Sequence, residues 1–366
     1  MPVHDHHTVP FDQETLEKLR IYEQYLTEFL PVFMNGKLPI KGIQVFDFFA
    51  GPGCDISGRL GSPLITCEVV TKFQNNQHGV HNKLVRLFFN EYERAKYERL
   101  SACFEGETSL PSQVKIEVCC MDFKEAFENQ YKTMQGYANL IFLDQNGIKQ
   151  IDRSVFERIT ALPRTDLLFF VSSSIVNRFK THNEIRKYLP LNDEDIEMMD
   201  GDNVHRILTA SYKRWLRPNQ VYYLGSFSIK KKANVYGLVF GSGHPLGIDK
   251  FLRIAWAHGG DANFDIDGDD IDPSAPSLFP EYDKPKKLSD FEKLFRKKVL
   301  EGTISTNIDA YMFTLEAGVL GSHAKDVLSQ MVKDGLLEKG QRFAISYDAW
   351  SKSMKQRILL CSGGRP

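Results

Sequence analysis

The sequence predicts an α/β protein whose main domain contains a mostly parallel sheet. Five apolar runs between positions 43 and 174 alternate with helical patterns, which is typical of a parallel sheet covered on both faces. Two later strand-like runs are separated only by residues 230–233, a gap too short for a crossover helix, so we expect an antiparallel hairpin. A segment at 259–287, rich in Asp, Gly and Pro, then forms a linker to a helical C-terminal part.

The elements of the main domain follow in order. An amphipathic helix is expected over 11–33, within an N-terminal helical segment at 1–40, because apolar residues recur along one side. Ser62 is suited to cap a second helix, which should run from Pro63 to about Asn76. Further helices are expected at 92–100, from the end of the third strand through Phe127, and around 153–159. The expected strands are 43–48, 85–91, 114–122, 138–147 and 166–174, followed by the hairpin strands 221–229 and 234–243.

This layout predicts a fold class and a second module. Five parallel strands followed by a hairpin are typical of class I methyltransferases, whereas plain nucleotide-binding doubly wound folds lack the hairpin. The prediction is therefore a Rossmann-like class I methyltransferase fold over residues 41–258. Beyond the linker, short helices at 290–300, 308–318 and 322–340, with RFAISY as a wing strand, predict a winged-helix-like α/β module at 288–366.

The composition excludes several kinds of protein. The chain has 366 residues, of which 42% are hydrophobic, and a net charge of −1, so any contact with nucleic acid must come from local patches. Its six cysteines are scattered without a CxxC pair, which indicates neither a disulfide framework nor a zinc ribbon. Because no long apolar stretch and no signal-peptide pattern is present, we expect a cytoplasmic protein without a membrane partner.

Acidic residues and a glycine turn fall where the expected strands end. Asp47 and the loop Ala50-Gly51-Pro52-Gly53 follow the first strand. Glu91 ends the second strand, Asp122 the third and Asp144 the fourth. Ligands of open parallel sheets bind at this edge.

These groups together outline a cofactor site. The glycines would let main-chain N–H groups approach a ligand, Glu91 would accept hydrogen bonds from ribose hydroxyls, and Asp122 would accept one from an adenine amino group. An adenosine with no pyrophosphate to neutralise fits S-adenosylmethionine better than NAD. Each acid also has a simpler interpretation as a helix cap, and Asp47 as a residue that shapes its own loop.

Longer runs of the chain resemble a known family. FDFFAGPG…GSPL, LFFNEYERAKYERL, FLDQNGIKQI, SFSIKKKANVYGLVFGSGHPLGIDKFLRIAW and GGDANFDID are similar to the three-Cys-motif partner family. These are bacterial and phage-associated proteins with a class I methyltransferase-like domain, and their genes accompany a radical-enzyme-like protein that carries three cysteines. The resemblance covers nearly the whole chain and implies a methyltransferase-like fold and that companion protein as a partner.

The end of the fourth strand bears on catalysis. Many amino-methylating nucleic-acid enzymes carry Asp or Asn, two prolines and an aromatic residue there, and the aromatic ring stacks on the flipped base. Here the segment is Asp144-Gln145-Asn146-Gly147, which keeps the acid and two amides but lacks the ring. No cysteine follows a proline, so methylation of a cytosine ring carbon is not expected. Asp144, Gln145 and Asn146 are therefore the candidate catalytic residues, although Asp144 alone could merely cap its loop or hold the cofactor's amino group.

The sequence thus predicts an S-adenosylmethionine-dependent methyltransferase that acts on nucleic acid or a modified base. The alternative is a non-catalytic partner that regulates its companion or presents substrate to it. Candidate phosphate contacts are Lys230, Lys231 and Lys232 in the hairpin turn, and Lys325 early in a helix that Ser322 would cap and that also carries His323. The same lysines could instead serve solubility, and the module could dock a protein. The acids at 265–272 do not match the calcium-binding EF-hand pattern, and no metal site is expected.

Overall fold

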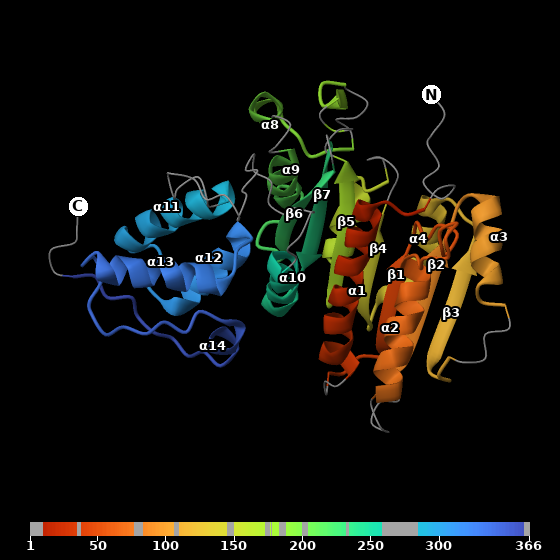
Figure 1. Cartoon of the computed structure of the whole chain (residues 1–366), viewed down its shortest axis with the longest axis horizontal. Helices are drawn as coiled ribbons and strands as arrows, with labels where there is room; N and C mark the ends of the chain where they lie inside the picture. The colour runs from red at the N-terminus through yellow and green to blue at the C-terminus, as the bar shows by residue number, and fades with distance from the viewer. Residues whose placement is uncertain are drawn as a thin grey trace.

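The structure, a computed structural model, describes most of the chain (Figure 1). The described residues are 10–34, 38–76, 83–105, 110–144, 150–172, 176, 178–182, 188–199, 204–231, 234–257 and 285–361. The acids at 265–272 and nearly all of the predicted linker at 259–287 lie outside them.

A seven-stranded sheet forms the centre of the molecule, with the strand order β3-β2-β1-β4-β5-β7-β6. Strands β1 to β5 run parallel, and β7 lies antiparallel between β5 and β6. This is the predicted arrangement of five parallel strands and a hairpin, so the class I methyltransferase fold is confirmed. The strands are β1 (Gly42–Asp47), β2 (Leu84–Asn90), β3 (Val114–Cys119), β4 (Ala138–Leu143), β5 (Thr165–Ser172), β6 (Tyr223–Lys231) and β7 (Asn234–Ser242).

Helices cover both faces of the sheet because successive side chains of each buried strand point into different cores. In β1, for example, Val45 joins one apolar core and Phe46 joins the other. The first core contains residues of α1 (Gln13–Met34), α2 (Ser62–Asn76), α3 (Arg94–Ala102) and α10 (Pro245–Ala257). The second contains residues of α4 (Phe123–Tyr131), the short 3₁₀ helix η2 (Lys132–Met134), α5 (Arg153–Thr160), α8 (Asp193–Met198) and α9 (Val204–Lys213).

The N-terminal helix α1 belongs to the core of the sheet domain. Tyr22, Tyr25, Leu26 and Phe29 on its inner face are at most 2% exposed. Its contacts place it against α2 and α10 across one face of the sheet (Figure 1). The start of α1 is thereby held near the carboxyl ends of the strands, where the predicted site lies.

The C-terminal module contains the three predicted helices and a short fourth. They are α11 (Lys286–Leu300), α12 (Asn307–Ala317), α13 (Gly321–Lys333) and α14 (Tyr347–Ser351). The prediction that Ser322 caps a helix is wrong, because Leu320 precedes the helix and its N–H donates to Nδ1 of His323.

The predicted wing strand RFAISY is also wrong. Phe343 and Ile345 are buried, but the main chain between them bonds to side-chain amides and not to a neighbouring strand. The carbonyl of Ala344 accepts from Asn307 at 2.8 Å, and its N–H donates to Oε1 of Gln356 at 3.0 Å. Isolated bridges Thr306–Arg357 and Leu337–Leu360 supply β pairing within residues 285–361.

The module packs beside β6, the last strand of the sheet (Figure 1). The indole N–H of Trp256, on α10, donates to the carbonyl of Gly318 at 3.0 Å. The ammonium of Lys287 lies 4.2 Å from the centre of the Phe227 ring and donates to the carbonyl of Ser226 at 3.3 Å. The His323 ring lies 4.9 Å from that of Trp256. The two parts of the chain therefore share a contact built from main-chain and aromatic groups.

The cysteines are as predicted, because all six are free thiols. They are Cys54, Cys67, Cys103, Cys119, Cys120 and Cys361. No helix in the described part of the chain is long and apolar enough to cross a bilayer.

Candidate functional site

The glycine loop after β1 has a backbone that requires glycine. Gly51 and Gly53 have φ angles of 64° and 87°, in the left-handed region that other residues avoid. The carbonyl of Gly53 accepts from the N–H of Gly61 at 2.7 Å, which closes the loop. A Cβ atom at Gly53 would lie only 3.1 Å from the sulfur of Cys103 on the segment after α3. Gly53 therefore allows both the turn and the close approach of a neighbouring element.

Glu91 lies directly against this loop. Its Oε2 accepts from the N–H of Gly51 at 3.0 Å, and its Oε1 accepts from the N–H of Glu93 at 2.7 Å. The structure thus brings together the predicted glycine turn and the predicted ribose-binding acid. Each carboxylate oxygen has two acceptor positions, so each can still accept a hydrogen bond from a ligand hydroxyl.

Asp47 is fully buried beneath the loop. It accepts from the hydroxyl of Ser62 at 2.5 Å and from the N–H of Phe49 at 3.1 Å. Burial raises the pKa of Asp47 to about 7 although these two bonds lower it, and the charges of Asp144 and Glu91 raise it further. Asp47 therefore shapes the loop, as its simpler interpretation expects, and direct contact with a cofactor stays a prediction.

Asp122 is the N-cap of α4, where its Oδ1 accepts from the N–H of Lys124 at 2.9 Å. Its side chain is exposed at the same edge of the sheet. Among the described residues, no hydrogen bond reaches its Oδ2. The capping role is thus established, and the second oxygen can accept a hydrogen bond from an adenine amino group.

Asn90 supports the candidate site and was not among the residues predicted from the sequence. Its side-chain amide donates to the carbonyls of Phe48 and Met121, at 3.3 and 3.0 Å, and accepts from the N–H of Met121 at 3.1 Å. Ala50 donates its N–H to the carbonyl of Asn90 at 3.0 Å. This buried amide fixes the loops after β1 and β3 relative to each other, and with them the glycine turn and Asp122.

Tyr92 is a second missed residue. It follows Glu91 directly and is 74% exposed, which is unusual for a large aromatic side chain. Its carbonyl accepts a long hydrogen bond of 3.6 Å from the thiol of Cys120, so the loops after β2 and β3 meet here. An aromatic residue next to a strand-end acid, as in FFNEY, is the pattern that could have identified it.

Asp144, the predicted catalytic acid, forms an ion pair. The ammonium of Lys18, near the start of α1, lies 2.6 Å from Oδ2 of Asp144 and 4.7 Å from the centre of the Phe170 ring. The side chains of Lys18 and Asp144 are 16% and 31% exposed. Gln145 and Asn146 lie outside the described residues, so their predicted roles stay predictions.

The chain before α1 is also anchored at this edge. Asp55, which follows the glycine loop, accepts from the N–H groups of Phe11, Ser57 and Arg59 and from the hydroxyl of Ser57, at 2.8 to 2.9 Å. Burial alone would raise the pKa of Asp55, but these four bonds lower it to about 2. The loop and the residues just before α1 are therefore held together by an ionised carboxylate.

The lysines predicted to contact phosphate are placed differently from expectation. Lys230 and Lys231 are not in the hairpin turn, because they are the last residues of β6 and pair with Val235 and Asn234. Lys232 lies outside the described residues. Lys325 is exposed on α13, whereas His323 is half-buried against Trp256, which leaves Lys325 as the accessible one of the two.

One family model is similar to part of the C-terminal module. Residues 265–339 match the family model of the GMT-like wHTH domain, which agrees with the predicted winged-helix-like module. The match begins within the segment predicted to be a linker. No curated protein matches the chain.

Several solved structures match this chain at low identity and low TM-score. EvdMO1 is 11% identical over 81% of this chain and 52% of its own, with a TM-score of 0.34, so this chain spans about half the length of EvdMO1. The O-methyltransferase TomG from Streptomyces achromogenes, solved with SAM, is 11% identical over 64% of this chain and 92% of its own, with a TM-score of 0.32. Loganic acid methyltransferase, solved with SAH, is 10% identical over 61% of this chain and 77% of its own, with a TM-score of 0.28. The fold assignment itself follows from the strand order and directions described above.

Proposed function

We propose that this protein is an S-adenosylmethionine-dependent methyltransferase that acts on nucleic acid or a modified base, together with the three-cysteine companion protein that its family resemblance implies. The observation that carries the proposal is the meeting of Gly51 and Glu91 at the carboxyl edge of a class I methyltransferase sheet, 3.0 Å apart from N to Oε2. Ligands of such sheets bind at this edge, near the point where the strand order reverses between β1 and β4.

The residues at this edge fit the cofactor. The loop of Ala50, Gly51, Pro52 and Gly53 would lie against its amino-acid end, Glu91 would accept from its ribose hydroxyls, and Asp122 would accept from its adenine amino group. Tyr92 offers an exposed ring on which the adenine can stack. S-adenosylmethionine, when bound, supplies an electrophilic methyl group on its sulfonium.

Asp144 would then orient the acceptor. Its carboxylate can accept a hydrogen bond from a substrate amine and direct the nitrogen lone pair toward the methyl group, so that rate comes mainly from alignment. Lys18 keeps this carboxylate in a fixed position through the ion pair at 2.6 Å. The match to a GMT-like wHTH domain supports nucleic acid as the substrate class, because helix-turn-helix modules insert a helix into the major groove.

Cofactor binding is tested by isothermal titration of the protein with S-adenosylmethionine and with its demethylated product. We expect Glu91→Ala to weaken the affinity for both molecules by at least about tenfold, because charge-assisted hydrogen bonds to the ribose are lost. Glu98→Ala on α3 is the matched control, since Glu98 is exposed and pairs with Arg94 away from the loop. If the wild-type protein binds neither molecule, the proposal is wrong.

The ion pair between Lys18 and Asp144 also favours a second candidate function. An acid that already has a lysine partner can be a structural link, and the protein would then act as a non-catalytic partner that presents substrate to its companion. The two candidates are separated by assaying methyl transfer with this protein and its companion together and apart. The assay uses the wild type, Asp144→Ala and, as a control, Glu128→Gln. Glu128 on α4 pairs with Arg158 on α5. Product that forms only with both proteins and is unaffected by Asp144→Ala would establish the partner role.

A further inference from the structure

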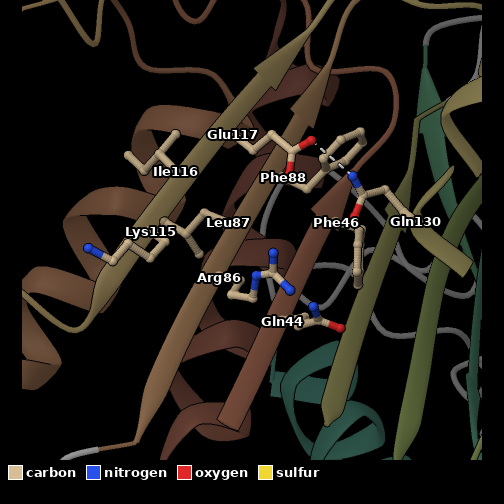
Figure 2. Close-up of a pocket in the computed structure, with 9 residues that line it drawn as sticks. All are labelled: Gln44, Phe46, Arg86, Leu87, Phe88, Lys115, Ile116, Glu117 and Gln130. Atoms are coloured by element: carbon tan, nitrogen blue, oxygen red, sulfur yellow. Dashed lines mark hydrogen bonds between the residues drawn. The ribbon is translucent and has the colours of Figure 1, made fainter. Parts of the chain in front are cut away.

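A pocket of about 290 Å³ opens on the sheet face opposite α1 and α2 (Figure 2). It lies over β1, β2 and β3, at the halves of these strands away from the proposed cofactor site. Gln44, Arg86, Lys115 and Glu117 supply its polar groups, and Phe46 and Phe88 supply its apolar ones. Nothing in the methyltransferase proposal uses this pocket.

The strand register sets three polar side chains in one row. Gln44 on β1 is opposite Arg86 on β2, and Arg86 is opposite Lys115 on β3. Neighbouring strands are about 4.8 Å apart, so the three side chains leave the sheet next to one another and on the same face. Figure 2 shows the three residues on neighbouring strands, with the side chain of Lys115 extending away from Arg86, and Phe46, Phe88 and Glu117 forming the next row along the strands.

The two cations of this row have no anionic partner in the described structure. The side chains of Arg86 and Lys115 form no hydrogen bond and no ion pair with any described residue. Glu117 lies in the next row, where it accepts from the side-chain amide of Gln130 at 3.0 Å. Like charges on adjacent strands repel each other, and an anion bound between them would remove that repulsion.

Gln44 adds an independent indication of a ligand. It is only 2% exposed, and its Nε2 donates a long hydrogen bond of 3.4 Å to the hydroxyl of Thr133. Its Oε1 is buried and has no hydrogen-bond partner among the described residues. A buried acceptor without a donor costs free energy, so this oxygen is suited to receive a hydroxyl or amino group of a bound molecule.

The pocket borders the C-terminal part of α4, whose Gln130 lines it. This helix has nine residues, and its Phe123 and Phe127 pack on Phe48, near the carboxyl ends of the strands. The row of Gln44, Arg86 and Lys115 lies farther toward the amino ends, beyond the helix. The aromatic row of Phe46 and Phe88 thus separates this pocket from the edge where Glu91 and Asp122 lie.

We propose that this row binds the phosphate group of a small phosphorylated molecule. Arg86 and Lys115 donate to the phosphate oxygens, and the buried Oε1 of Gln44 accepts from a hydroxyl or amino group of the same molecule. Phe46 and Phe88 border its less polar part. A volume of about 290 Å³ lies just below the range of roughly 300–1,000 Å³ for small-molecule pockets, which suits a sugar phosphate or a mononucleotide and not a polymer.

Isothermal titration of the full chain with inorganic phosphate, ribose 5-phosphate and uridine 5′-monophosphate tests the proposal. Because ribose hydroxyls also suit Glu91, binding at this pocket is recognised by its loss in Lys115→Glu. We expect saturable binding to the wild-type protein. Lys115→Glu should weaken the affinity by at least about tenfold, and Lys115→Arg should keep it within a few-fold of the wild-type value. Glu117→Gln should tighten binding, because it removes the one acid of the pocket lining. Lys72→Glu on α2, an exposed lysine on the opposite face, is the control and should change nothing.

Both Lys115 and Glu117 are exposed on the edge strand β3, so these substitutions leave the core intact, and thermal unfolding of each variant verifies this. S-adenosylmethionine titrations of the same variants should be unchanged, which separates this pocket from the proposed function. The proposal is overturned if none of the three probes binds, if Lys72→Glu weakens binding as much as Lys115→Glu, or if oligonucleotides bind at Lys115 while mononucleotides do not.

Discussion

Asp47 is a buried acid whose protonation depends on the fold. Its pKa of about 7 lies above the ordinary value of 3.8, mainly because burial disfavours the charged form. The folded protein therefore holds this proton more tightly than the unfolded chain does. It follows that Asp47 contributes most to stability below pH 4, and that this contribution is lost as the pH rises from about 4 to 7.

Substitution of Asp47 by Asn should remove this dependence on pH. Asn keeps an acceptor for the N–H of Phe49 but does not titrate. Between pH 5 and pH 8 the free energy of unfolding should fall in wild type more than in Asp47→Asn. The difference between the two decreases should be up to about 3 kcal/mol. Urea unfolding at several pH values measures this, with Glu98→Gln as an exposed control. Identical pH profiles for Asp47→Asn and wild type would contradict the assignment.

Residues of the candidate site were predictable where a residue type suited to the cofactor stands at the end of a strand. Gly51, Glu91 and Asp122 stand at strand ends, so their grouping at one edge follows from the parallel sheet alone. Lys18 was not predictable, because it lies 126 residues from Asp144 and meets it only through the packing of α1. Asn90 was missed for a related reason, since a polar residue inside an apolar run reveals nothing about its partners until the neighbouring loops are placed.

At the scale of elements, α1 is joined to β5 by a buried hydrogen bond. The hydroxyl of Tyr25 donates to Oδ2 of Asp166 at 2.6 Å. Burial raises the pKa of Asp166 to about 6, while hydrogen bonds from Ser242 and Tyr25 lower it. The bond from Tyr25 therefore matters most above pH 6, where Asp166 is ionised.

Tyr25→Phe should accordingly destabilise the fold by about 1–3 kcal/mol at pH 8 and by less at pH 5, where Asp166 is protonated. Denaturant unfolding at the two pH values provides the measurement. Tyr212→Phe is a matched control, because Tyr212 is a buried aromatic in the other core and its hydroxyl forms no hydrogen bond with a described residue. An equal loss for Tyr25→Phe at both pH values would mean that the bond to the ionised carboxyl is not the cause.

Helix α13 offers a test of nucleic-acid binding. Its buried residues, Ala324, Val327, Leu328 and Met331, face the module core, so Lys325 is on the outer side. If this face contacts phosphates, Lys325→Ala should weaken binding to duplexes of any sequence and reduce the slope of log K against log salt by about 1. Fluorescence anisotropy over a salt series measures this, with Lys297→Ala on α11 as the control. An unchanged slope would exclude α13 as the contact.

The elements themselves were largely predictable, and the errors have a physical cause. Long apolar runs identified β1 to β5, and the short gap between two runs identified the hairpin. RFAISY has the alternation of a strand, but side-chain amides of Asn307 and Gln356 satisfy the main chain of Ala344. A pattern of apolar residues reports which side chains are buried and not which groups pair with the backbone.

At the scale of the whole molecule, Trp256 joins the two parts of the chain. Its indole N–H donates to Gly318, and its ring lies against His323. Trp256→Ala removes both contacts and should uncouple the module from the sheet domain. We expect one calorimetric unfolding transition for wild type and two for Trp256→Ala. Tyr212→Phe serves again as a control, and a single transition for Trp256→Ala would show that other contacts suffice.

The position of the module also affects how the sheet meets other chains. β6 is an outermost strand, and such strands readily pair with strands of other molecules. The module lies beside it, and the ammonium of Lys287 donates a hydrogen bond to the carbonyl of Ser226. A sheet domain cut after Ala257 would therefore present a bare edge, the kind of surface on which intermolecular strand addition and aggregation begin.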